Sequence, residues 1–148
     1  MASRKLVVAA AIAALTIIAG AVIADWMIVT DEERVEELID VVTGRVDHDS
    51  IDRALGWTDL SRQPLEVSFR GQSYRFDSDD AESLRTSAFT HLAAYQGERL
   101  TLLQKHIEMK GTSATVTVDT LSRRGRTTVD YELRKSGARW LLSGVHVR

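Results

Sequence analysis

The fold of this chain is decided by one alternating stretch, residues 113–147, which reads SATVTVDTLSRRGRTTVDYELRKSGARWLLSGVHV. Apolar and polar side chains alternate over residues 114–119 and again over 129–134. A period of two places one set of side chains on each face of a β-sheet. Glycine-containing turns are expected at 123–125 and 136–137, which predicts consecutive antiparallel strands.

The residues before this stretch predict two helices and a hairpin. Thr30 to Glu33 form a capping box, and apolar residues at helical spacing follow up to Gly44. A second, short helix is expected from Ser50 to Leu55, capped near Asp49. Alternation over residues 65–76, interrupted by Arg-Gly-Gln in the middle, predicts a β-hairpin.

A longer helix is expected next, because Asp79 and Glu82 are spaced as a capping box and Gly97 can end the helix. Its expected apolar stripe consists of Ala81, Leu84, Ala88, Leu92 and Tyr95. Residues 99–109 then form the first of four meander strands. The fold class is therefore α+β, with the long helix covering one face of a curved, four-stranded antiparallel meander.

The order of these elements, and the ending GARWLLSGVHV, resemble the NTF2-like superfamily, also called SnoaL-like or cystatin-like. The resemblance covers about residues 31–147 and rests on element order. It implies a cone: a bent sheet wrapped against helices, in many members with a pocket between them. It implies no particular activity, because the superfamily includes isomerases, dehydratases, cyclases, transport adaptors and dimerisation modules.

The N-terminus carries an uncharged run, Leu6 to Ala24, which is 19 residues long and follows Arg4 and Lys5. As a helix it measures about 28 Å, close to the ~30 Å hydrocarbon core of a bilayer. Its length favours a retained anchor over a cleaved signal, whose apolar region needs only about 7 to 15 residues. Cleavage after the small residues at 19–21 or 22–24 stays open. Both alternatives export the remaining chain.

These features predict three segments: a cytoplasmic N-terminus of residues 1–5, a transmembrane signal-anchor of residues 6–26, and an exported domain of residues 27–148. The domain would be periplasmic if the source is bacterial. The chain has no cysteine, which excludes disulfides, thiolate metal sites, cysteine nucleophiles and a lipidated cysteine. Attachment to a membrane would therefore depend on residues 6–26 themselves.

Few side chains can supply chemistry inside the expected cone. Asp119, Asp130 and Glu132 alternate with apolar neighbours and are expected to face solvent. His106 and Glu108 are expected to face outward, and a bulge at Ser143-Gly144 would also place His146 outside. The remaining candidates for a pocket lining are His91, Tyr95, Tyr131 and Trp140.

No metal, cofactor or catalytic set is expected. The segment VDHDS at 46–50 holds two carboxylates and an imidazole, but adjacent residues rarely converge on one ion, so a turn and helix cap explain it better. Phosphate-binding loops, nucleophile elbows and metalloprotease motifs are absent from the sequence. The aromatic residues fit core packing.

Charge is distributed unevenly along the chain. Residues 25–98 carry 17 acidic and 7 basic residues, whereas residues 99–148 carry 4 acidic and 10 basic ones. A solvated basic sheet face explains this bias, and a surface for an anionic partner formed by Arg123, Arg124 and Arg126 is the alternative. Nucleic acid is not expected as a partner in an exported compartment.

The function expected from the sequence is a membrane-anchored, non-catalytic binding or assembly module. The open sheet face is its expected contact surface, for a second copy or for a partner in a membrane complex. The alternative is a small-molecule carrier or an isomerase-like or dehydratase-like enzyme that uses the cone pocket.

Overall fold

The computed structural model describes residues 30–148, and Glu32–Arg148 form one compact unit. The expected anchor at residues 6–26 lies outside the described residues. Within residues 30–148, no helix has the length and apolar character that a membrane span requires.

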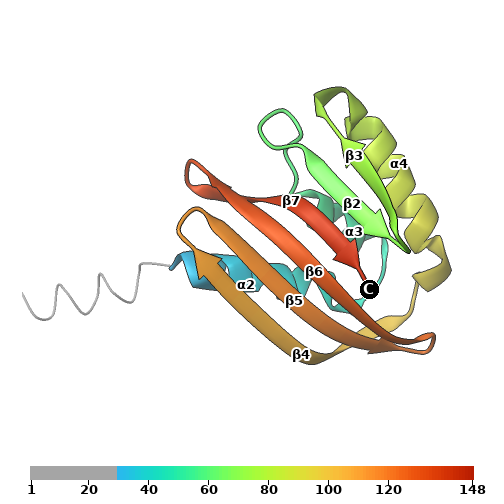
Figure 1. Cartoon of the computed structure of the whole chain (residues 1–148). Coiled ribbons are helices and arrows are strands. Elements are labelled where there is room, and N and C mark those ends of the chain that lie inside the picture. Colours follow the sequence, from blue (N-terminus) through green and yellow to red (C-terminus); the bar gives the residue numbers. More distant parts are fainter. Residues whose placement is uncertain (1–29) are drawn as a thin grey trace, which may run out of the picture. The chain divides into compact units, whose positions relative to one another are not determined.

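The domain is a single bent sheet with helices on one side (Figure 1). Its helical elements, in chain order, are α2 (Asp31–Val42), α3 (His48–Leu55), η1 (Ser78–Asp80), α4 (Ala81–Leu92) and η2 (Ala93–Tyr95). Its strands are β1 (Gly44–Arg45), β2 (Leu65–Phe69), β3 (Gln72–Phe76), β4 (Arg99–Lys110), β5 (Ser113–Ser122), β6 (Gly125–Ser136) and β7 (Arg139–Val147). The α+β class and the predicted element order are confirmed.

The sheet has seven strands in the order β1-β4-β5-β6-β7-β2-β3. The four long strands form the predicted antiparallel meander. The hairpin β2–β3 joins it because β2 pairs parallel to β7, a contact that no local pattern signals. The two-residue strand β1 pairs with the start of β4 and was not predicted.

The hairpin turn consists of Arg70 and Gly71, and Phe69 already pairs with Gln72. Both turn residues have positive φ, 51° for Arg70 and 78° for Gly71. Two consecutive positive φ angles are typical of the turn that matches the right-handed twist of the strands. The turn is therefore one residue shorter than the sequence pattern indicated.

Two helix caps differ from the predicted ones. Helix α3 is capped by Asp47, whose carboxylate accepts the amide of Ser50 at 2.8 Å, two residues before the predicted cap. In front of α4, the capping box joins Asp77 and Asp80 rather than Asp79 and Glu82. In a run of acidic residues several carboxylates can cap, and the tertiary path of the chain selects one of them.

The core is formed mainly by α2 and the inner face of the sheet. Val35, Leu38 and Ile39 lie on one side of α2 at helical spacing and are buried. They pack against inner-face residues of β5, β6 and β7, among them Val116, Leu133, Trp140 and Leu142. Because the packed side chains belong to the helix and the sheet together, neither is stable alone.

Helix α4 contributes less to the core than its sequence suggests. Only Leu84 of the predicted stripe is buried, Leu92 is 37% exposed, and Ala81 is exposed. The helix also ends earlier than predicted, at Leu92, and continues as η2. Helix α4 packs against the sheet through Leu84, in the same cluster as Leu65 of β2, but α2 supplies three core residues and α4 supplies one.

A bulge in β7 sets the direction of its last side chains. Glu132 pairs with Gly144 and Leu133 pairs with Leu142, so Ser143 has no opposite residue. The extra residue reverses the alternation. Trp140 and Val145 are five positions apart and would point to opposite faces of a regular strand, yet both contact the core. His146 therefore lies on the outer face. The predicted bulge at Ser143-Gly144 is confirmed.

Candidate functional site

The arginines of the predicted anionic-partner surface lie at the turn between β5 and β6. The Arg124 guanidinium donates to the Glu98 carboxylate at 3.1 Å and to the carbonyl of Ala94 at 2.8 Å, and lies over the ring of Tyr95. Arg126 pairs with Asp119. Arg123 is exposed and makes no hydrogen bond or ion pair with residues of the described range.

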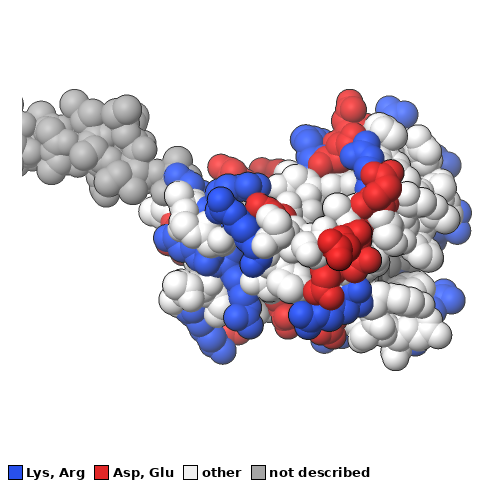
Figure 2. All heavy atoms as spheres, turned by 90° about the horizontal axis from the view of Figure 1, so that it is seen from above, with Lys and Arg blue, Asp and Glu red and all other residues white. Residues whose placement is uncertain are grey.

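Two of the three arginines thus hold parts of the domain together. Seen from above, basic side chains gather towards the end at which α2 begins, and acidic ones form a band across the middle (Figure 2). This side of the domain therefore presents both signs of charge rather than one continuous basic surface.

Asp119 is the most constrained acidic residue on the outer face. Its side chain is 10% exposed, and it accepts hydrogen bonds from Arg126 and, at 2.5 Å, from the Thr128 hydroxyl. These side-chain hydrogen bonds, Arg126 first, hold the pKa of Asp119 below its ordinary value. The predicted face is correct, but the expected exposure is wrong, because the neighbouring side chains on the same face cover the carboxylate.

The structure does not bring the four predicted pocket residues together. His91 is exposed on α4, and Tyr95 lies under Arg124. Trp140 is 5% exposed and lies in the core. It borders a hollow that two residues of α2 also line. Tyr131 packs against the core from β6, and burial raises its pKa.

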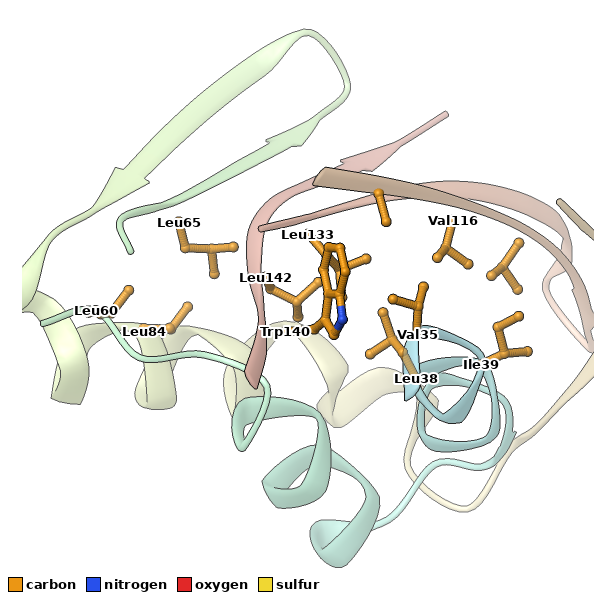
Figure 3. Close-up of a cluster of buried hydrophobic side chains, with 12 residues drawn as sticks. Val35, Leu38, Ile39, Leu60, Leu65, Leu84, Val116, Leu133, Trp140 and Leu142 are labelled. Carbon is orange, nitrogen blue, oxygen red and sulfur yellow. The ribbon is translucent and has the colours of Figure 1, made fainter. Parts of the chain in front are cut away.

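Apolar side chains fill the space between the sheet and the helices (Figure 3). One hollow of about 180 Å³ opens at the side of this core. It is lined by Arg34, Glu37, Gly56, Trp57, Ala138, Arg139 and Trp140. A ligand site normally needs about 300 Å³ or more with several convergent polar groups. Within residues 30–148, no group of three metal-binding side chains is present.

The most organised polar cluster lies on the outer face, where β6, β7 and β2 adjoin. The Ser68 hydroxyl is 2.5 Å from His146 Nδ1, and His146 Nε2 is 3.4 Å from a Glu132 carboxylate oxygen. The His146 side chain is 29% exposed. Both ring nitrogens therefore face a partner, one hydroxyl and one carboxylate.

Sequence reasoning placed His146 and Glu132 on the outer face but did not combine them with Ser68. Ser68 lies 78 residues from His146 and becomes its neighbour through the parallel pairing of β2 with β7. The one usable signal was Gly144, a glycine within a strand, which often marks a close approach of other atoms.

A second polar cluster adjoins the first. Asp130 pairs with His146 in register and accepts hydrogen bonds from Thr117 at 2.7 Å and from Arg148 at 2.9 Å. Together with Asp119 and its partners, these contacts form a continuous polar surface across β5, β6 and β7.

No family model matches this chain, and no curated protein matches it significantly. Solved structures do match. A protein of unknown function with a cystatin-like fold from Nostoc punctiforme is 20% identical, with a TM-score of 0.58, over 82% of this chain and 93% of that one. A putative dehydratase from the NTF2-like family of Streptomyces avermitilis is 12% identical, with a TM-score of 0.58, over 79% and 94%.

An NTF2-like protein with a cystatin-like fold from Novosphingobium aromaticivorans is 15% identical, with a TM-score of 0.56, over 79% of this chain and 80% of that one. The described domain is therefore similar to NTF2-like, cystatin-like cone proteins, as the sequence resemblance implied. At these identities the similarity shows the fold and no activity.

Proposed function

We propose that this NTF2-like cone is an assembly module, anchored to a membrane by residues 6–26, which pairs with a second copy of itself through the outer face of β4, β5 and β6. The observation that carries the proposal is the filled interior. A residue such as Leu38, fully buried between helix and sheet, occupies the space where a cone enzyme would need a cavity.

The outer face of these strands supports the contact, because helix α2 lies behind it (Figure 1). Strands of about ten residues at ~3.4 Å per residue, spaced ~4.8 Å apart, give β4, β5 and β6 a footprint of roughly 500 Å². The accessible surface area of this face is larger than its flat footprint, because side chains project from it. It approaches the ~800 Å² per partner that a standard interface buries.

Charge favours a second copy over an unrelated partner. Arg123 lies at the β5–β6 turn, beside Arg126 and its partner Asp119, whereas Glu132 and the ion pair of Glu108 with Lys110 flank Thr115 nearer the opposite end of the same strands. A two-fold axis through the face would place the arginines of one copy opposite the glutamates of the other. An isologous interface requires such self-complementarity.

The membrane anchor is supported by the sequence. The uncharged run of 19 residues is long enough to span, and the basic residues precede it, which favours a cytoplasmic N-terminus and an exported domain. Tethering would also raise the local concentration of copies, so a modest pairing affinity would suffice.

The alternative, a carrier or enzyme that uses the cone interior, is not favoured. Of its proposed lining residues, Tyr131 and Trp140 pack in the core, whereas His91 is exposed and Tyr95 lies under Arg124. The 180 Å³ hollow is lined by only one of the four, Trp140. A second use of the domain would therefore have to be sought on its surface.

The test is sedimentation velocity of the full chain in mild detergent, with and without Thr115→Arg. Thr115 lies between Glu108 and Glu132 on the outer face, so in the proposed pairing the new cation would meet the arginines of the other copy. We expect dimer for the wild type and at least a tenfold weaker dimer for the variant. Thr90→Arg, the same change at an exposed position of α4, is the matched control and should leave the dimer intact.

A monomeric wild type at high micromolar concentration would contradict the proposal. An undiminished dimer in Thr115→Arg, with Thr90→Arg also unchanged, would show that pairing uses another surface. Circular dichroism of both variants would establish that each remains folded.

A further inference from the structure

We propose that Ser68 is an activated nucleophile, with His146 as its general base and Glu132 as the residue that orients the base, and that this cluster transfers acyl groups from small carboxylic esters. The proposal goes beyond pairing and does not rest on it. It assigns a chemical activity to the β2–β7 margin of the outer face.

The contacts suit one tautomer of the ring. A carboxylate accepts hydrogen bonds only, so in the tautomer that the proposal requires, Nε2, 3.4 Å from Glu132, carries the ring proton. The opposite nitrogen, Nδ1, then offers a lone pair to the Ser68 hydroxyl at 2.5 Å. The ring nitrogens are exchanged relative to serine proteases, but the order hydroxyl, imidazole, carboxylate is the same.

Gly144 is needed for this arrangement because of space. A Cβ at position 144 would lie 2.7 Å from a Glu132 carboxylate oxygen and 2.9 Å from His146 Nε2. The residue does not have a positive φ, so backbone freedom does not explain the glycine. The missing side chain leaves the room in which the imidazole and the carboxylate meet.

The backbone also holds the cluster rigidly. Ser68 and His146 are directly paired in the parallel ladder, and Glu132 pairs with Gly144 immediately beyond the bulge. Three side chains on three adjoining strands are placed more precisely than side chains on loops. Ser68 is half-buried and His146 is partly exposed, so a small solute can reach both.

The chemical step is balanced as follows. The Ser68 oxygen attacks the ester carbonyl while its proton passes to His146 Nδ1. The tetrahedral intermediate expels the alcohol, which takes that proton from Nδ1, and an ester of Ser68 remains. Water attacks this ester with the same base, which releases the carboxylic acid and restores Ser68. Because Ser68 is half-buried and the His146 side chain is 29% exposed, small esters with good leaving groups are the substrates that fit.

The test uses the full chain with a fluorophosphonate probe and with p-nitrophenyl acetate, and intact and peptide mass spectrometry to locate the adduct. We expect the adduct on Ser68 and its complete loss in Ser68→Ala. His146→Gln should lower the labelling rate by about 100-fold, within the usual contribution of a general base. The matched controls are Ser73→Ala, the hydroxyl opposite Ser68 on β3, and His106→Gln on β4; both should label normally.

Gly144→Ala tests the positioning of the base separately. Crowding between the new methyl group, Glu132 and His146 should lower labelling at least tenfold while Ser68 and His146 are both still present. The double variant Gly144→Ala/Glu132→Ala should label no faster than Glu132→Ala alone, because removing the crowding does not replace the missing carboxylate. Faster labelling of the double variant would contradict the role given to Glu132.

Two results would overturn the proposal: no adduct on Ser68 at millimolar probe, or labelling of Ser68 no faster than that of Ser73. Each measurement is repeated in Thr115→Arg, so that coverage of the face by a second copy cannot account for a negative result. Labelling of Ser68 in a monomeric protein would support the nucleophile and contradict only the pairing.

Discussion

Truncating Leu38 to alanine should test whether the interior of the cone is filled. The side chain is fully buried between α2 and the sheet. Removing three carbon atoms costs roughly 2.4 kcal/mol in transfer free energy at ~0.8 kcal/mol per methylene. The cavity that remains adds to this, so we expect about 3 to 4 kcal/mol, within the range of measured Leu→Ala substitutions.

The measurement is urea unfolding followed by tryptophan fluorescence. At an m value of about 1.5 to 2 kcal/mol per molar, the loss lowers the midpoint by about 2 M without changing m. Leu92→Ala is the matched control: it removes the same atoms from a side chain that is 37% exposed and should cost less than about 1 kcal/mol. A cost below 1 kcal/mol for Leu38→Ala as well would show that the interior is loosely packed. It would refute the reasoning and restore the cone pocket as a ligand site.

Three further outcomes are expected. The pKa of Asp119 is lowered in the folded state, so the stabilisation by its carboxylate is present above the unfolded value of 3.8 and is lost as pH falls through the lower folded pKa. Asp119→Asn should therefore destabilise the domain at neutral pH. Urea unfolding of both proteins should show that the difference in stability shrinks under acid conditions. Arg124→Ala should speed amide hydrogen exchange in η2, because this guanidinium ties η2 to the sheet, whereas Arg123→Ala should leave exchange unchanged. Intact mass spectrometry of the membrane fraction should find residues 6–26 retained and resistant to alkaline carbonate extraction; soluble protein that begins near residue 22 or 25 would contradict the anchor.

Residues close together in sequence were sufficient to predict the long strands, the hairpin and the three α-helices, but not the short strand β1. The alternation over 114–119 and 129–134 gave strands because every second side chain of a strand shares a face, whatever the strand packs against. The spacing of Val35, Leu38 and Ile39 predicted α2 for the same kind of reason. The glycine within the Arg70–Gly71 turn predicted the hairpin.

The element order alone did not show how much each helix would be buried. Five residues of the sequence were assigned to an apolar stripe on α4, yet only Leu84 is buried, and the stripe is less distinct than that of α2. Amphipathicity shows which side of a helix can be buried, but the position of the helix over the sheet decides how much of it is. For α4 that position depends on the hairpin in front of it, whose docking is itself a long-range contact.

What the sequence determined by itself is the long strands, the three α-helices, the position of the turns and the outward face of polar residues such as Asp119 and His146, because these depend on local periodicity and on glycine turns. What only the tertiary structure decided is which residues meet. Ser68 and His146 become partners only when β2 aligns parallel to β7, and Asp119 is covered only once its strand neighbours are in register. Such contacts are selected by packing of the whole domain, which lowers the free energy of one arrangement among many that are locally equivalent.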